Sequence, residues 1–404
     1  MADFFQNGVI TTLHNLTDRP LEDLEKELER FSSRNPMSLV LPSLFSELEG
    51  PALGPILDEL QGAKYLREIV IGLDRADESQ FHYARDYFGR LPQEHRILWN
   101  DGPRLRAVDK MLADKGLAPT EMGKGRNVWY CFGYVLAAGR GRAVALHDCD
   151  IVTYKRELLA RLFYPVANPN FNYQFCKGYY SRIANGSLNG RVCRLLVSPL
   201  IHSLQKVVGH SDYLDYLNSF RYALAGEFSM RADVLRDLRI PSDWGLEIGV
   251  ISEMFRNYAA SRICQVDIAD VYDHKHQDLS AEDPQKGLSR MSTDITKAMI
   301  RKLATHGTVF SRATFRTLKA TYFRTALDFV ERFYNDAQIN GLQIDRHKEE
   351  KAVELFAENI VRAGETYLSN PMATPSMPSW NRVISAIPDI LDHIYEAVEE
   401  DNKG

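Results

Sequence analysis

Cysteine is scarce in this sequence, and its spacing argues against two common uses of the residue. The chain has five cysteines among 404 residues, which is an odd number. No two of them form a Cys-x-x-Cys pair, so the pattern disfavours both a disulfide framework and a zinc ribbon. We therefore expect each cysteine to be a small buried side chain.

Long apolar segments are also absent. No run of eighteen or more apolar residues occurs, and residues 1–5 do not begin a basic segment followed by an apolar one, as a signal peptide would. The net charge of -5 provides no general attraction for nucleic acid or an anionic membrane. We expect a cytoplasmic protein without nucleic-acid or membrane partners, in which local basic residues hold any small anionic ligand.

Apolar residues are nevertheless plentiful, at 45% of the chain, which is enough for a substantial core. Apolar runs at residues 38–42, 68–74 and 143–148 are typical of buried strands, and helical patterns separate them. We expect the first strand to stop at Pro42. This alternation predicts an α/β fold with a mainly parallel, doubly wound sheet. Ligands bind at the carboxyl ends of the strands in such sheets, and Asp74 and Asp148 stand at two of these ends.

The chain is expected to have three parts. An amphipathic helix at residues 20–34 indicates an N-terminal helical extension over residues 1–35. The mixed strand and helix pattern covers residues 36–290 and divides near residue 150. Residues 291–404 are predicted to form a helical C-terminal extension. Its helical patterns cover residues 292–305, 311–338, 347–368 and 380–399.

Asp148 and Asp150 are the first candidates for chemistry. They are two residues apart at a predicted strand end, so both carboxylates point to one side while His147 and Cys149 point to the other. Carboxylates together with diphosphate oxygens are the ligands that Mg²⁺ or Mn²⁺ prefers. The alternative is a solvated loop at the strand end, and the spacing alone leaves both interpretations open.

Two glycine-containing segments could bind an anion. Lys124 lies between two glycines at the start of a predicted helix, where the helix N-terminus already favours negative charge. Arg191 follows Asn189 and Gly190 at the start of another, and its guanidinium suits a phosphate or carboxylate. Either cation could instead be an ordinary exposed side chain.

Three further segments carry titratable groups. His274 and His276 follow the last predicted strand and could return to the site as a metal ligand and an anion donor, or could belong to a surface loop. Glu227 follows Gly226, and Glu247 begins a helix with a core-like apolar face. An acid at such a helix start is either an N-terminal helix charge or a buried functional carboxylate, and spacing does not decide between these.

Taken in order, these segments resemble one family. The matching segments are Gly123-Lys124-Gly125, Asp148-Cys149-Asp150-Ile151, Phe175 to Arg182, Asn189-Gly190-Arg191-Val192, Ala225-Gly226-Glu227-Phe228, Gly245-Leu246-Glu247-Ile248-Gly249, Gln265-Val266-Asp267 and His274-Lys275-His276. They resemble the glucosyl-3-phosphoglycerate synthases and their mannosyl-transferring relatives. The resemblance covers roughly residues 36 to 280. It implies the GT-A fold, a Rossmann-like nucleotide-sugar-binding domain, with a donor half up to about residue 150 and an acceptor half over about 151–290.

The resemblance also implies an activity. It implies a retaining enzyme that moves glucose from UDP-glucose to the 2-hydroxyl of 3-phosphoglycerate, a step in the synthesis of the compatible solute glucosylglycerate. A divalent cation, Mg²⁺ or Mn²⁺, is the implied cofactor, and a homodimer is the expected assembly.

The resemblance further implies roles for individual residues of this chain. The implied metal ligands are Asp150 and His274. The implied donor-binding residues are Pro42, Ser43, Leu44, Glu47, Asp74, Lys124 and Asp148. The implied acceptor-binding residues are Gly190, Arg191, Cys193 and His276. Glu247 would face the reacting sugar, and Cys193 stands where the family commonly has threonine, a better hydrogen-bond partner for phosphate.

Other functions fit parts of the pattern. Mannosyl transfer from GDP-mannose to 3-phosphoglycerate or glycerate would use the same scaffold. A metal-dependent hydrolase would need three or more protein ligands and would act without a sugar donor. In an inactive binding module, the carboxylates of Asp148 and Asp150 would be structural only, and an Asp150→Ala variant would keep its cellular function.

Overall fold

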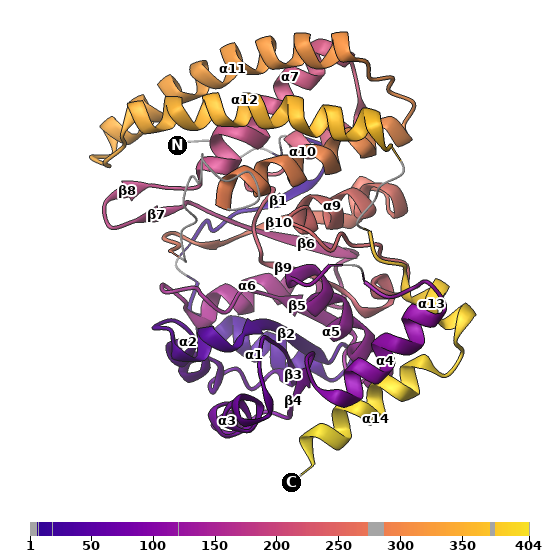
Figure 1. Ribbon diagram of the computed structural model, residues 1–404. Coiled ribbons are helices and arrows are strands. Elements are labelled where there is room, and N and C mark those ends of the chain that lie inside the picture. The colour runs from indigo at the N-terminus through magenta and orange to yellow at the C-terminus, as the bar shows by residue number, and fades with distance from the viewer. Residues whose placement is uncertain are drawn as a thin grey trace.

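A central sheet of eight strands organises the structure, which is a computed structural model (Figure 1). The model describes residues 6, 8–17, 19–119, 121–273, 287–371 and 376–403. In spatial order the strands are β1 (Thr11–Leu13), β10 (Ile263–Ala269), β6 (Phe175–Tyr180), β9 (Phe228–Arg231), β5 (Ala143–Leu146), β2 (Met37–Leu44), β3 (Leu66–Asp74) and β4 (His95–Trp99). All pairings are parallel except those of β9 with β5 and β6. The predicted α/β class with a mainly parallel sheet is confirmed.

Alternation along the central strands places apolar side chains on both faces of the sheet. In β2, Leu39 and Leu41 join one core cluster, whereas Val40 joins the other. The first cluster contains side chains of α1 (Leu21–Ser32), α2 (Leu53–Leu60), α3 (Glu78–Phe88) and α6 (Arg156–Ala167). The second contains side chains of α4 (Pro103–Asp114) and α5 (Lys124–Ala138). Covering both faces in this way is what lets parallel strands be continuously apolar.

One boundary prediction is wrong. The run at residues 38–42 was expected to stop at its proline, but β2 continues through Pro42 to Leu44. Beyond Val40 the strand is paired with β3 but no longer with β5. Pro42 is therefore tolerated because one side of the strand needs no hydrogen-bond donor there. The extra residues carry Ser43 and Leu44 to the same level as Asp74 at the end of β3.

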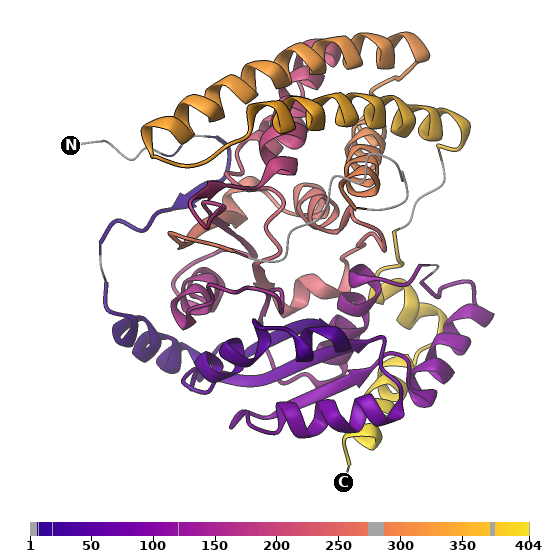
Figure 2. The same ribbon diagram turned by 60° about the vertical axis from the view of Figure 1, so that its left-hand side comes forward.

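The helical C-terminal extension packs in two separate places (Figures 1 and 2). Its helices are α10 (Gly287–Thr305), α11 (Arg312–Ile339), α12 (Arg346–Ser369), α13 (Trp380–Ala386) and α14 (Ile390–Asn402). The first three lie at one end of the molecule against α7 (Ser198–Val208) and α9 (Leu246–Asn257). The last helix, α14, returns to the opposite end and contacts α4, α5 and β4. The division of the chain at residues 35 and 290 stays a prediction.

Aromatic stacking fixes the returning segment to α5. Trp380 is buried and its ring stacks on Trp129 of α5, with the ring centroids 4.1 Å apart. A Cβ atom on Gly133 would lie 2.3 Å from the Trp380 ring, so only glycine leaves room for this contact. The far end of the chain thereby becomes part of the core.

Two expectations from composition can be compared with the structure. All five cysteines are buried and none forms a disulfide, which confirms that they are small core side chains. Across the described residues, no helix combines the length and apolar character that crossing a membrane would require.

Candidate active site

Residues at the carboxyl ends of β2 and β3 form the first wall of the candidate site. Asp74 ends β3, pairs in register with Leu44, and is only 5% exposed. Asn100 donates a hydrogen bond of 2.8 Å to its Oδ1 atom. Burial raises the pKa of Asp74, and this hydrogen bond partly opposes the rise. Asp74 is therefore a buried hydrogen-bonding group at the position where this fold class binds its ligands.

A cluster beside the end of β5, the neighbour of β2, brings together three of the residues that the sequence singled out. Lys124 begins α5, Asp148 follows β5, and Glu247 lies in the first turn of α9. The Nζ atom of Lys124 lies 2.5 Å from Oδ1 of Asp148 and 3.2 Å from Oε1 of Glu247. Burial disfavours the charge of Lys124, but the two carboxylates outweigh burial and raise its pKa. One ammonium group therefore joins segments that are 123 residues apart.

A second lysine is buried near the cluster of Lys124, Asp148 and Glu247, which we call the charged centre. The sequence analysis did not identify this lysine. Lys177 of β6 is completely buried, and its Nζ donates a hydrogen bond of 2.5 Å to the carbonyl oxygen of Ala225. Burial lowers its pKa to about 8, against the opposing influence of Glu247 and Glu227. The signal in the sequence was a lone cation within the otherwise apolar strand FCKGYY.

Glu227 is the buried acid of this centre. It is completely buried, and it accepts hydrogen bonds from the hydroxyl groups of Tyr180, at 2.8 Å, and Tyr272, at 2.6 Å. The two tyrosine rings stack with their centroids 3.7 Å apart. Burial and the nearby charge of Asp148 raise the pKa of Glu227. Glu227 is thus a buried, hydrogen-bonded acid, and the tyrosines are partners that spacing could not reveal.

Gly226 keeps space beside the Asp148 carboxylate. A Cβ atom at this position would lie 2.5 Å from Oδ2 of Asp148, closer than such contacts occur. The missing side chain of Gly226 leaves the Asp148 carboxylate room to receive a ligand. A divalent cation that takes oxygen ligands from carboxylates and phosphate suits this position. The residues present at this strand end therefore fit Mg²⁺ or Mn²⁺.

The Gly226→Ala variant tests this arrangement. We expect kcat/KM to fall by about tenfold to a hundredfold, because the new methyl group must displace the Asp148 carboxylate by about 1 Å. Steady-state kinetics measure the effect. Gly54→Ala is the matched control, since a Cβ atom there meets its nearest neighbour, the Tyr87 hydroxyl, at an ordinary 3.5 Å. Equal activity of the two variants would contradict a role for the space beside Asp148.

The loop that carries Asp150 is fixed to the segment after β10. The backbone N–H of Val152 donates to the carbonyl oxygen of Asp273 at 2.9 Å, and the N–H of Asp273 donates to Oγ1 of Thr153 at 3.0 Å. The predicted ligand His274 and the predicted acceptor residue His276 lie outside the described residues. Within the residues that the structure describes, no three His, Cys, Asp or Glu side chains are grouped as a metal site. Asp150 stays a predicted ligand.

The predicted acceptor segment contacts the C-terminal extension. Gly190 has a φ of +74°, a left-handed conformation that favours glycine. The Nε atom of Arg191 donates a hydrogen bond of 2.9 Å to Oε1 of Glu349. Glu349 is a residue of α12 and is only 2% exposed. Cys193 is buried, and burial raises its pKa to about 11. The structure thus connects Arg191 to the C-terminal extension, and its role in acceptor binding stays a prediction.

The remaining donor-site predictions fall near the first wall. Ser43 is buried beside Cys149. Burial raises the pKa of Cys149, and a hydrogen bond with the Ser43 hydroxyl partly opposes this rise. Pro42 and Leu44 are partly exposed in β2, and Glu47 is partly exposed in the short helix Phe45–Glu49 that follows. These positions lie at the same end of the sheet as Asp74, but their contacts with a nucleotide stay predictions.

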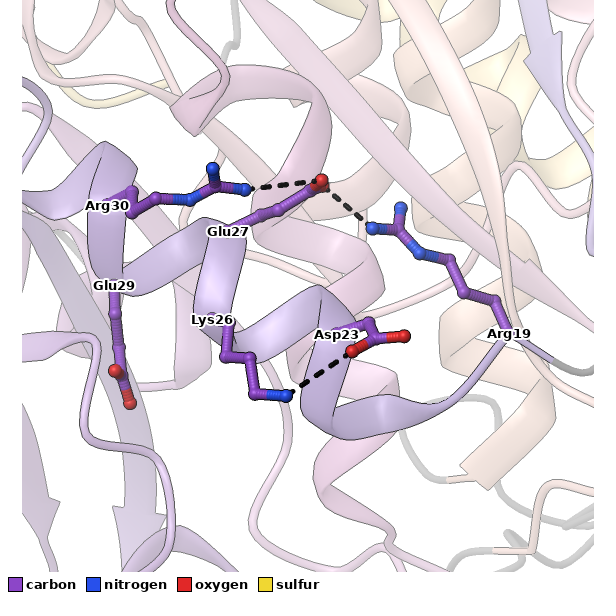
Figure 3. A pocket seen from close by; sticks show the side chains of 6 residues that line it. All are labelled: Arg19, Asp23, Lys26, Glu27, Glu29 and Arg30. Carbon is purple, nitrogen blue, oxygen red and sulfur yellow. Dashed lines mark hydrogen bonds and ion pairs between the residues drawn. The ribbon is translucent and has the colours of Figure 1, made fainter.

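A surface hollow of about 770 Å³ lies away from these residues, on the solvent side of α1 (Figure 3). Five of the six charged side chains that line it pair with one another. Glu27 contacts Arg19 at 2.9 Å and Arg30 at 3.5 Å, and Asp23 contacts Lys26 at 3.5 Å. Exposed pairs of this kind are typical of a solvated helix, so we assign no site there.

The segment that leads into α9 gives a pH-dependent prediction. Burial and the nearby carboxylate of Asp294 raise the pKa of Asp243 to about 6. The folded state therefore binds this proton more tightly than the unfolded chain, so the free energy of unfolding falls as pH rises from about 4 to 6. Asn at this position can still accept the hydrogen bond from the N–H of Gly245, which is 2.9 Å long.

We expect Asp243→Asn to unfold at a higher temperature than the wild type at pH 7. Its free energy of unfolding should be larger by at most about 3 kcal/mol. The difference should disappear at pH 4, where the wild-type carboxyl is also neutral. Thermal unfolding at both pH values measures this. A difference of the same size at pH 4 would show that the carboxylate charge is not its cause.

The fold and the site define a class of protein. The mainly parallel sheet, with paired acids and an ammonium group at the carboxyl ends of its strands, is that of a GT-A glycosyltransferase. A crystal structure of glucosyl-3-phosphoglycerate synthase from Mycobacterium tuberculosis with phosphoglyceric acid matches with a TM-score of 0.54 at 20% identity. The match covers 73% of this chain and 88% of that one.

Curated relatives identify the family, although no protein-family model matches the chain. Glucosyl-3-phosphoglycerate synthase from Persephonella marina is 46% identical over 402 residues, which cover 100% of this chain and 99% of that protein. The enzyme of the same name from Methanococcoides burtonii is 39% identical over 407 residues, covering 99% and 98%. The chain belongs to the glucosyl-3-phosphoglycerate synthase family.

Proposed function

We propose that the protein is a retaining transferase that moves glucose from UDP-glucose to the 2-hydroxyl of 3-phosphoglycerate. The observation that carries the proposal is the position of Lys124 between Asp148 and Glu247 at the carboxyl ends of the strands, in a chain of this family. The Mycobacterium tuberculosis enzyme has been crystallised with Mn²⁺, UDP-glucose and phosphoglyceric acid, and separately with Mg²⁺ and UDP.

The difficult part of this reaction is the departure of UDP from the sugar. The bond between the anomeric carbon and the diphosphate oxygen breaks, and the electron pair stays on that oxygen. Lys124 supplies a fixed positive charge beside this developing negative charge, and a group already held in position stabilises the transition state without reorganisation. The raised pKa of Lys124 keeps it charged at neutral pH.

A divalent cation, Mg²⁺ or Mn²⁺, would be held by Asp150 and His274 and, when bound, would neutralise charge on the diphosphate. Asp148 has a separate role in this proposal. Its carboxylate faces the donor and keeps the Lys124 ammonium in position through the 2.5 Å contact. Asp74, Glu47 and residues 42–44 would contact the uridine end of the donor.

The acceptor forms the new bond. Its 2-hydroxyl oxygen attacks the anomeric carbon from the face that the diphosphate leaves, and the hydroxyl proton passes to the departing phosphate oxygen. Front-face attack retains the configuration without a covalent enzyme intermediate. Glu247, held by Lys124 at 3.2 Å, would position the sugar and the acceptor. Gly190, Arg191, Cys193 and His276 would lie on the acceptor side, and holding both substrates together lowers the entropic part of the barrier.

A donor panel tests the proposal. The protein is incubated with Mg²⁺ or Mn²⁺, 3-phosphoglycerate and UDP-, ADP- or GDP-sugars, and released nucleotide and new phosphosugar are measured. We expect UDP release from UDP-glucose, with formation of glucosyl-3-phosphoglycerate. Turnover of GDP-mannose instead would favour the mannosyl-transferring alternative, and no release with any donor would refute the proposal.

We also propose that the enzyme is a cytoplasmic homodimer. Light scattering of the purified protein measures the mass of the assembly. A mass equal to that of one 46.1 kDa chain would contradict the assembly.

A further inference from the structure

A cavity of about 370 Å³ lies between the acceptor half of the sheet domain and the C-terminal extension. We call it the arginine cavity because Arg182, Arg194 and Arg221 all line it. Its other side is formed by residues of α11 and the turn that follows, among them Phe333 and Asn340. Three cations around one small space, opposed by the exposed carboxylate of Asp336, give the cavity a positive character.

Arg194 is a buried donor that the fold holds in place. It is only 7% exposed. Its Nε donates a hydrogen bond of 2.7 Å to the carbonyl oxygen of Asn189, and its guanidinium carbon lies 5.0 Å from the ring centre of Phe333. Its Nη1 pairs with Glu349 at 2.8 Å. In the described part of the chain, neither its buried Nη1 nor its buried Nη2 has a hydrogen-bond partner, so Nη1 meets Glu349 as an ion pair only. Burying such donors without a partner is unfavourable, which favours an acceptor atom supplied by a ligand or by water.

Arg182 contributes a second available donor. It is half-buried, and its Nη1 contacts the hydroxyl of Tyr222 at 3.4 Å. Among the described residues, its buried Nε also lacks a hydrogen-bond partner. A Cβ atom on Gly190 would lie 3.2 Å from the Cβ of Arg182, so the backbone of the predicted acceptor segment runs directly against this side chain.

The arginine cavity shares a wall with the candidate active site. Tyr180 and Cys193 both line it, and the hydroxyl of Tyr180 donates to the buried Glu227 beside Asp148. Cys193 is a weak partner for a phosphate, whereas the next residue, Arg194, offers charge-assisted hydrogen bonds. The cavity therefore supplies the donors that Cys193 lacks.

The C-terminal extension holds this wall in position. The hairpin of β7 (Ile183–Ala184) and β8 (Ser187–Leu188) leads from Arg182 to the acceptor segment. Its backbone bonds to the turn after α11, through Leu188 N–H to Gln343 O at 3.2 Å and Gln343 N–H to Gly186 O at 2.7 Å. This contact gives α11 and α12 a role in shaping the cavity.

We propose that the arginine cavity binds the anionic groups of the acceptor, and that Arg182 and Arg194 determine specificity for a phosphorylated carboxylic acid. The inference rests on the proposed function, because it takes 3-phosphoglycerate as the acceptor. Arg194 and Arg182 donate to phosphate or carboxylate oxygens, while Glu349 orients Arg194 from behind.

Calorimetric titration with 3-phosphoglycerate tests the proposal independently of turnover. We expect Arg182→Gln and Arg194→Gln each to raise the Kd for 3-phosphoglycerate by about tenfold to a hundredfold. The KM for 3-phosphoglycerate should rise in parallel, and the Kd for UDP-glucose should stay unchanged. Arg316→Gln is the matched control, because it removes an exposed positive charge from α11 outside the cavity and should leave all three constants unchanged.

The outcomes separate this inference from the proposed function. If the wild type transfers glucose but Arg182→Gln and Arg194→Gln keep its Kd and KM, the cavity assignment is wrong and the function stands. If the wild type binds 3-phosphoglycerate through these arginines but transfers no sugar, the proposed function fails and the anion site stands. A raised Kd with an unchanged KM would place the anion outside the acceptor site and overturn the assignment. Because Arg194 also pairs with buried Glu349, Arg182→Gln decides if Arg194→Gln does not fold.

Discussion

Replacement of Asp150 by alanine should lower kcat/KM for glucosyl transfer by about 10³-fold or more. The Asp150 carboxylate lies on the loop after β5. It is a predicted ligand of the cation that neutralises the leaving diphosphate. Loss of such charge stabilisation removes several kcal/mol from the transition state. UDP release, measured over a range of Mn²⁺ and Mg²⁺ concentrations, gives the effect and shows whether added metal restores part of the rate.

The control for this variant is Asp86→Ala. Asp86 is an exposed carboxylate on α3, so its removal changes the net charge equally but leaves the site intact. Its kcat/KM should equal that of the wild type. If Asp150→Ala retains more than about a tenth of wild-type activity while folded, Asp150 does not bind a catalytic metal.

The second large effect is expected for Lys124→Met, with a loss of about 10²- to 10³-fold in kcat/KM. The variant removes the positive charge beside the leaving diphosphate and also the counter-ion that Asp148 and Glu247 share. With two acids brought together and their common cation gone, we also expect a lower unfolding temperature at neutral pH. Steady-state kinetics and thermal unfolding measure the two effects separately.

Lys124→Arg and Lys110→Met provide the comparison. The arginine variant keeps the charge and should recover part of the stability, although its planar group does not reproduce the lysine geometry. Lys110 is exposed on α4, away from the site, so Lys110→Met should behave as the wild type. A Lys124→Met enzyme with normal kcat would exclude Lys124 from stabilising the leaving group.

The sequence alone determined many of the local elements and their order, although β1, β4 and β9 were not predicted. Apolar periodicity identified β2, β3 and β5 and the long C-terminal helices, because the pattern of a strand or a helix repeats within a few residues. The two-residue spacing of Asp148 and Asp150 at a strand end placed an acidic site at the correct edge of the sheet. The ordered segments also identified the family, since their resemblance did not depend on knowing how they pack.

The boundary at Pro42 shows where local reasoning failed. Proline lacks an N–H, so the strand was expected to end there. Whether that donor is needed depends on which neighbours pair at that level, and β5 is paired only with Met37 to Val40 of β2. Register is a property of the assembled sheet, so the sequence could not supply it.

Only the tertiary structure decided which charges meet. Lys124, Asp148 and Glu247 come from three distant segments, and Lys177 and Glu227 become buried only when β6 and β9 pair. In the same way, Arg191 and Arg194 find Glu349 only because α12 folds back across the acceptor half. Local patterns encode secondary structure, whereas the pKa and the partner of a charged group depend on burial and on long-range packing, which no short segment of the chain contains.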